Sequence, residues 1–256
     1  MCKSMPIILL FITIAILVAL TLVGLRLLHT GYSEKSTPEL ALAAFFLLGG
    51  AATFGFDLVA REFLVDSPEW QAGFRTASNL ASRVPAPAIA LFTWKVFRPT
   101  ERWAAQLFML IVGVQLGLNV HQLWTGGHPA PIGGPVFWVG VGTTVVALGW
   151  AMADSFSYYR TSVRRLTLGL TTPIVTDRFL LWAVFSGTAM LILIGKVTTV
   201  LVFAADAPFT PARSAITAFQ SVVGLTCITT LTLTFYPPAA YRRWVEGRAS
   251  GQVAAS

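Results

Sequence analysis

Seven apolar stretches, each close to the length that a helix needs to cross a lipid bilayer, constrain this chain more than any other feature. About 20 mainly apolar residues are needed to cross roughly 30 Å of hydrocarbon. The stretches are Pro6–Leu28, Leu40–Leu64, Leu80–Phe97, Trp103–Leu123, Pro135–Met152, Phe179–Ala204 and Ala215–Tyr236. We therefore expect an all-α protein, a polytopic integral membrane bundle of seven transmembrane helices over residues 1–245, with a short, loose polar cytoplasmic tail over residues 246–256.

The low content of charge excludes the common soluble classes. Only 11% of the residues are charged and 55% are hydrophobic, whereas a typical soluble domain carries about 25% charged residues. A soluble chain of this size would have too few charges to cover its surface. Cys2 and Cys227 are the only cysteines and form no C-x-x-C spacing, so neither a disulfide scaffold nor a zinc or redox motif is indicated.

Lysine and arginine set the expected orientation, because cytoplasmic loops of membrane proteins are enriched in both. With the N-terminus outside, the inner side holds Arg26, Lys35, Lys95, Arg98, Arg102, Arg160, Arg164, Arg165, Arg178, Arg242, Arg243 and Arg248, and the outer side only Lys3, Arg61, Arg75, Arg83 and Arg213. The sequence therefore predicts an outer N-terminus, an inner C-terminus and a location in the cell (inner) membrane. The first stretch is expected to be retained, because its apolar run is too long for a signal peptide and no A-x-A-like site follows; cleavage would leave six helices.

Two ionisable residues lie at membrane depth, where charged side chains are costly and commonly functional. Asp57 is in the second stretch and Lys196 in the sixth, each roughly 10–12 Å below the expected outer boundary at 1.5 Å per residue. A pair between them would neutralise both charges. Alternatively, Asp57 pairs with Arg61 one turn along its own helix, and the aliphatic stem of Lys196 lets its ammonium reach the outer headgroups.

A polar patch is expected at the outer end of the fourth stretch. Gln115 and Asn119 are four residues apart and share a helix face, and His121 follows. They predict a polar pocket open to the exterior. An ordinary hydrated helix end is the alternative, and it is favoured for His121 and for His128 in the next loop. The predicted ligand-binding residues are Asp57, Arg61, Gln115, Asn119, His121 and Lys196.

Basic residues gather in the segments expected on the inner side. Within the inner loop, Tyr158–Leu170 is predicted to extend the fifth helix and to lie near the membrane surface, with Gly169 and Pro173 ending it. Arginines here and near the C-terminus are expected to contact anionic lipid or a membrane or cytoplasmic protein partner; the alternative is that they only fix the topology. These residues are Arg160, Arg164, Arg165, Arg242 and Arg243.

Small residues predict close helix packing in two of the stretches. Gly113 and Gly117 form a GxxxG pattern in the fourth stretch, and Gly49 and Gly50 are adjacent in the second. Glycine lets two helix backbones approach closely in a membrane.

Known catalytic motifs are missing from the sequence. There is no H-E-x-x-H, no G-x-S-x-G and no P-loop, and the three histidines do not supply paired axial ligands for two haems. Lys196 lies in the sixth stretch, whereas the retinal lysine of microbial rhodopsins lies in the last helix. We therefore expect no enzyme activity, no cofactor and no bound metal. Nucleic acid is not an expected partner, because the chain has no basic soluble domain.

Two stretches carry a resemblance to known membrane proteins. They read VPAPAIALFTWKVFRPTERW (84–103) and RRLTLGLTTPIVTDRFLLW (164–182). The chain resembles the seven-helix membrane modules that precede signalling domains in some bacterial sensor proteins, and stand-alone bacterial seven-helix membrane proteins without a characterised function. The resemblance implies a fold and topology more than an activity, because this sequence has no kinase or cyclase domain.

Two classes of function are compatible with this pattern. The first is a non-enzymatic sensor or partner-binding subunit, with a polar pocket near the outer face and a basic cytoplasmic face. The second is a small transporter or channel that uses Asp57 and Lys196. A transport path needs polar groups in the inner half of the bundle, and the inner halves of the second and sixth stretches are nearly all apolar. The sequence therefore favours the first class.

Overall fold

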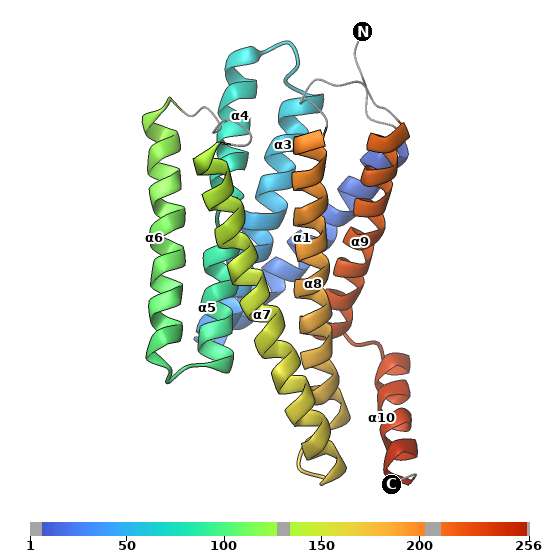
Figure 1. The fold of residues 1–256 in the computed structure, drawn as a ribbon. Helices are drawn as coiled ribbons and strands as arrows, with labels where there is room; N and C mark the ends of the chain where they lie inside the picture. Colours follow the sequence, from blue (N-terminus) through green and yellow to red (C-terminus); the bar gives the residue numbers. More distant parts are fainter. Residues whose placement is uncertain (1–6, 127–133, 203–210, 255–256) are drawn as a thin grey trace. The chain divides into compact units, whose positions relative to one another are not determined.

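The computed structural model describes residues 7–126, 134–202 and 211–254, and the regular elements in these ranges are helices (Figure 1). Six of the described helical segments are long and apolar enough to cross a membrane, so the chain is a multi-pass membrane protein by the length and composition of its helices. They are Thr13–Ser33, Thr37–Glu62, Arg102–Trp124, Pro135–Thr167, Pro173–Thr199 and Ala218–Phe235.

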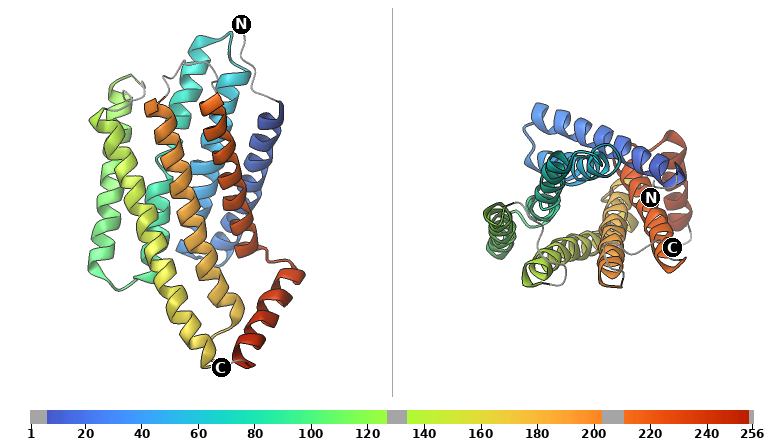
Figure 2. Two further views of the ribbon diagram at one scale, coloured as in Figure 1. Left: turned by 45° about the vertical axis from the view of Figure 1, so that its right-hand side comes forward. Right: turned by 90° about the horizontal axis from the view of Figure 1, so that it is seen from above.

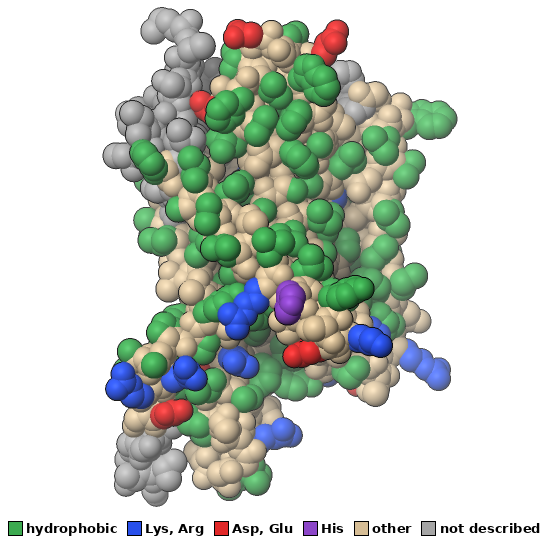
Figure 3. All heavy atoms as spheres, turned by 180° about the vertical axis from the view of Figure 1, so that it is seen from behind, with side chains coloured by type: hydrophobic (Ala, Val, Ile, Leu, Met, Phe, Trp, Pro, Cys, Tyr) green, Lys and Arg blue, Asp and Glu red, His purple; other side chains and the backbone are tan. Residues whose placement is uncertain are grey.

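Large apolar side chains remain exposed on many helices. Leu22, Met109, Leu191 and Val222, from four different helices, are among them. Hydrophobic side chains cover much of the face drawn in Figure 3. A surface of this kind is solvated by lipid rather than by water, which supports contact with a bilayer.

The chain divides into two compact units, which are described separately. Unit 1 comprises residues 1–147 and 200–207, and unit 2 comprises residues 148–199 and 208–256. The boundary falls inside one helix, between Ala147 and Leu148. A single transmembrane domain over residues 1–245 stays a prediction.

Unit 1 is built from the first helices of the chain. They are α1 (Ile7–Ser33), α2 (Thr37–Ala44), η1 (Phe45–Ala52), α3 (Thr53–Glu62), α4 (Pro68–Ala81), α5 (Pro85–Phe97), α6 (Arg102–Trp124) and the first part of α7 (Pro135–Thr167). The elements α2, η1 and α3 form one uninterrupted rod. Its middle part, η1, is a π-helix, whose wider turn is a local irregularity of the kind often found at functional sites.

The third predicted helix is interrupted. Helix α5 begins only at Pro85, and residues 82–84 separate it from α4, which occupies a segment that the sequence left as a loop. Pro85 and Pro87 suit a first helical turn, because amides there have no intrahelical partner. Helix α5 thus matches the expected stretch Leu80–Phe97 except for its first five residues, but with 13 residues it is not among the six helices long enough to cross a membrane alone.

Helices α4 and α5 together run antiparallel to the α2–η1–α3 rod (Figure 2). The Gln71 Nε2 donates to the Ala60 carbonyl at 3.0 Å, and the Ser78 hydroxyl donates to the Thr53 carbonyl at 2.9 Å. Pro85 then lies against Gly49, at the middle of the 26-residue rod. The break between α4 and α5 is thus level with the centre of the second span.

Glycines in the rod allow this close packing, as predicted. A Cβ on Gly49 would lie 2.3 Å from Cγ of Pro85, and one on Gly50 would lie 3.0 Å from Cδ1 of Leu20 on α1. Gly113 and Gly117 differ from the prediction, because no described atom lies within 4 Å of a Cβ on either residue. Their GxxxG pattern faces away from the rest of unit 1.

Unit 2 contains the rest of α7, most of α8 (Pro173–Val202), α9 (Pro211–Phe235) and α10 (Ala239–Ala254). A Cβ on Gly187 of α8 would lie 3.5 Å from the Met152 sulfur of α7. The rings of Trp182 on α8 and Phe235 on α9 meet edge to face at 5.8 Å. These contacts join α7, α8 and α9 along their lengths.

Helix α7 continues to Thr167, so the predicted extension of the fifth helix is confirmed. It continues in the direction of the span, without the turn that a position along the membrane surface would need. Gly169, at φ 69°, ends it in a Schellman motif, with the Leu170 amide donating to the Arg165 carbonyl. Pro173 begins α8 instead of only ending α7.

The C-terminal segment is helical over residues 246–254, which the sequence described as a loose polar tail. Helix α10 packs through Val245, which is buried, and through Tyr241, whose hydroxyl donates to the Asp177 carboxylate near the start of α8. The first turns of α10 are therefore fixed to unit 2 by side-chain contacts.

Candidate functional site

Asp57 and Arg61 form an ion pair on the surface of α3. The distance from Arg61 Nη2 to Asp57 Oδ2 is 2.5 Å, and Arg61 Nε donates to Asp57 Oδ1 at 3.1 Å. This confirms the alternative in which Asp57 is neutralised within its own helix. Lys196 is exposed on α8 in unit 2, and a pair between Asp57 and Lys196 stays a prediction.

Helix α6 presents one buried stripe, and two of the predicted polar residues belong to it. Gln115 is only 3% exposed, and it shares the stripe with Ile111 and Leu118. Asn119 lies beside the stripe and is half-buried, whereas His121 is exposed. The predicted shared face is thus confirmed for Gln115 and Asn119, while His121 fits the interpretation of an ordinary helix end.

Buried amide oxygens on and beside this stripe accept no hydrogen bond from the described residues. The Gln115 Oε1 and the Asn119 Oδ1 are buried and have no hydrogen-bond partner among the described residues. An unsatisfied buried acceptor costs roughly 1–3 kcal/mol. Such groups in a folded protein therefore call for a partner, which water or a ligand can supply.

Arg83 is the residue that the sequence analysis missed. The sequence predicts it on the outer side, near the end of the third stretch, but it lies in the break between α4 and α5. A Cβ on Gly140 of α7 would lie 3.4 Å from Arg83 Nη1 and 3.6 Å from Cδ1 of Leu118 on α6. The Arg83 Nη1 therefore lies next to α7, at a position that a side chain of α6 also approaches. The only signal in the sequence was its position two residues before Pro85.

The guanidinium of Arg83 forms no ion pair within the part of the chain that the structure describes. Its Nε is buried without a hydrogen-bond partner, and none of the described carboxylates forms an ion pair with it. Leu118 is six residues before the end of α6, and Gly140 is five residues after the start of α7. At 1.5 Å per residue, both lie roughly 8–9 Å below these helix ends. A cation at this depth is costly and marks a functional site by default.

We call these five residues the Arg83 cluster: Arg83, Gln115, Leu118, Asn119 and Gly140. It offers a guanidinium donor and amide acceptors between apolar walls. It contains no nucleophile and no general base. The described residues also contain no group of three His, Cys, Asp or Glu side chains that could hold a metal ion. The arrangement is therefore suited to binding rather than to chemistry.

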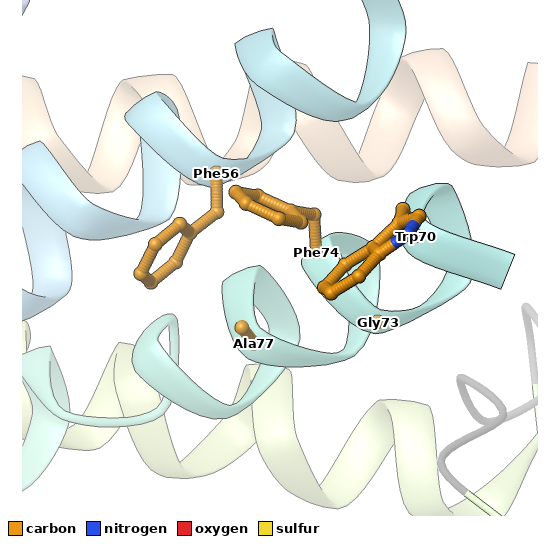
Figure 4. Close-up of a pocket in the computed structure, with 5 residues that line it drawn as sticks. All are labelled: Phe56, Trp70, Gly73, Phe74 and Ala77. Atoms are coloured by element: carbon orange, nitrogen blue, oxygen red, sulfur yellow. The ribbon is translucent and has the colours of Figure 1, made fainter. Parts of the chain in front are cut away.

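A separate hollow of about 200 Å³ lies between α3 and α4 (Figure 4). The rings of Phe56 and Phe74 meet edge to face at 5.7 Å on one side, and Trp70 lies on the other. Gly73 and Ala77 complete its lining. The lining is apolar, so this hollow is not the polar pocket that the sequence predicted.

The basic residues predicted to meet lipid or a partner are exposed in unit 2. Arg160, Arg164 and Arg165 follow the last turns of α7, and Arg242 and Arg243 lie on α10. The Arg160 guanidinium lies 4.6 Å from the centre of the Phe156 ring. Their exposure is compatible with both proposed roles and does not distinguish between them.

Tyr241 connects α10 to α8 through its hydrogen bond to Asp177. Burial raises the pKa of the Tyr241 phenol above its ordinary value, and the hydrogen bond and negative charge of Asp177 raise it further. The phenol therefore stays protonated and donating through the physiological pH range. The ring also stacks on Trp244 at 5.8 Å.

Asp154 is a buried charged residue that the sequence pattern did not single out. It lies on α7 two residues beyond the predicted end of the fifth span, and it is 6% exposed. The Trp150 indole donates to its Oδ2 at 2.9 Å. This contact gives Asp154 a structural role within the helix.

Comparisons with protein-family models, curated proteins and solved structures find no match for the chain.

Proposed function

We propose that this chain is a non-enzymatic membrane protein that binds a small polar ligand at the Arg83 cluster and acts as a sensor or partner-binding subunit. The observation that carries the proposal is the set of buried polar groups in the cluster that lack protein partners. Packing alone would be better served by apolar side chains at these positions, because each open polar group lowers stability.

The architecture that we propose has seven crossings, with the N-terminus outside and the C-terminus inside. The seventh crossing is the interrupted pair α4–α5, which follows the second span along its length. Interrupted helices at membrane depth are tolerated where they line a cavity, and they commonly form binding sites. The basic residues of α7 and α10 then lie on the cytoplasmic side, where anionic lipid or a protein partner is available.

The orientation predicts opposite labelling of two positions. We expect a cysteine at Gly126 to react with a membrane-impermeant thiol reagent in intact cells, and a cysteine at Arg164 to react only after permeabilisation. The variants are made in a Cys2→Ser/Cys227→Ser background. Six crossings with an outer N-terminus would reverse both results, because α4–α5 would then not cross. Reaction at both positions in intact cells would mean that α7 does not cross.

A one-sided pocket predicts one-sided access to the Arg83 cluster. In the same background, Asn119→Cys should react with an impermeant thiosulfonate added outside, because the half-buried position faces the hydrated cluster. Leu116→Cys is the matched control. Leu116 is exposed and lies outside the buried stripe of the same helix, where lipid keeps the thiol protonated and unreactive.

The same measurement distinguishes the two classes of function. Reaction of Asn119→Cys only from the outside supports a sensor-type pocket. Reaction from both sides of proteoliposomes favours a transporter or channel. Equal inertness of positions 119 and 116 would mean that the cluster is dry and would overturn the proposed binding function.

A further inference from the structure

We infer that the Arg83 cluster recognises a small organic acid that carries a second polar donor, such as a hydroxy or amino carboxylic acid. The inference rests on the proposed binding function and specifies the chemical class of the ligand. The carboxylate would meet the Arg83 guanidinium, and the hydroxyl or ammonium group would meet the Gln115 amide.

The need for an anion follows from the surroundings of Arg83. The side chain cannot be deprotonated in a protein, so a half-buried guanidinium with a buried Nε favours a counter-charge or strong hydrogen-bond acceptors beside it. No described carboxylate forms an ion pair with it. Its Nη1 lies against Gly140 of α7, at a position that Leu118 of α6 also approaches. A carboxylate fits this fork in two parallel hydrogen bonds, which an ammonium-type side chain would not allow.

The need for a second donor follows from α6. The buried Gln115 Oε1 and Asn119 Oδ1 accept no hydrogen bond from any described residue. A simple fatty or aryl acid would satisfy Arg83 but leave both acceptors open. A hydroxyl or ammonium group one or two bonds from the carboxylate would satisfy them as well. The apolar walls at Leu118 and Gly140 favour a small ligand over a large one.

The first test measures the charge of the site with a chemical probe. Asn119→Cys is labelled with a sulfonate-bearing and with an ammonium-bearing thiosulfonate of similar size. A cation at roughly 10 Å should favour the anionic reagent by at least about tenfold at an effective dielectric constant of about 20. Arg83→Gln should remove this preference and Arg83→Lys should keep it. Lys95→Gln removes a positive charge near the other end of α5 and should leave the reagent preference unchanged.

The second test measures recognition. Millimolar lactate and alanine should slow the labelling of Asn119→Cys several-fold, whereas lactamide and propionate should protect weakly. Arg83→Lys should lose most of the protection while the reagent preference remains, which separates a binding defect from misfolding. Protection by lactamide equal to that by lactate, no protection by any acid, or a reagent preference unchanged in Arg83→Gln would each overturn the inference. Reaction at position 119 without acid protection leaves the proposed binding pocket intact, so the two failures are distinguishable.

Discussion

Replacing Gly49 by alanine should destabilise unit 1 by roughly 1–3 kcal/mol, which is the usual cost of overpacking a tight core. The new methyl group would lie 2.3 Å from Cγ and 2.7 Å from Cδ of Pro85. These atoms belong to a ring at the start of α5, so they cannot move aside as the end of a flexible side chain can. The rod and the interrupted helix must then separate locally. The melting temperature of the purified protein in mild detergent measures the effect.

Two further variants make this prediction specific. Gly117→Ala adds the same methyl group on α6, where no described atom lies within 4 Å, and it should be neutral or slightly stabilising because alanine favours helix over glycine. Pro85→Ala removes the ring and should recover much of the stability lost in Gly49→Ala. Equal melting temperatures for the Gly49 and Gly117 variants would show that α5 does not pack on η1 in this way.

Apolar length made the continuous spans predictable. The stretch Trp103–Leu123 agrees with α6 to within one residue at each end, and Ala215–Tyr236 lies within one residue of the end of α9. In these segments the requirement to fill the hydrocarbon layer decides the structure, and that requirement is visible in composition alone.

Helix α4 could not be predicted by the same criterion. Its sequence, PEWQAGFRTASNLA, is not apolar enough to be recognised as a span. Its helical state depends on partners outside the segment, namely the backbone acceptors and the Phe56 ring that α3 supplies. Tertiary contacts of this kind are not encoded in local composition.

The Arg83 cluster was predictable only in its α6 half. The spacing of Gln115 and Asn119 placed them on one face, because a helix repeats every 3.6 residues. The arrival of Arg83 at Leu118 and Gly140 depends on where the break falls along the rod, and that is set by the contact of Pro85 with Gly49. The sequence places residues 82–84 inside the expected continuous span Leu80–Phe97, so Arg83 is predicted as a charge at the outer end of that span.

Removing the Tyr241 hydroxyl should free α10 from unit 2. A hydrogen bond to a charged group contributes about 1.5–3 kcal/mol, so Tyr241→Phe should raise the opened fraction of α10 by roughly tenfold to a hundredfold. The ring that stacks on Trp244 is kept, so only the contact with Asp177 is lost. The rate of tryptic cleavage at Arg242 and Arg243 measures the opening. Tyr32→Phe removes an exposed hydroxyl and should leave this rate unchanged.

The same contact should make α10 sensitive to alkaline pH. Because the folded-state pKa of Tyr241 is raised above its ordinary value, folding favours the protonated phenol. The stabilisation is complete below about pH 10, the ordinary tyrosine value, and it is lost as the pH rises through the folded-state pKa. Beyond that point a phenolate would face the Asp177 carboxylate and the two would repel. In an absorbance titration, one of the five tyrosines should ionise later than the rest, and Tyr241→Phe should remove that late step. A late step that persists in this variant would assign the raised pKa to another tyrosine and leave α10 without a pH-dependent contact.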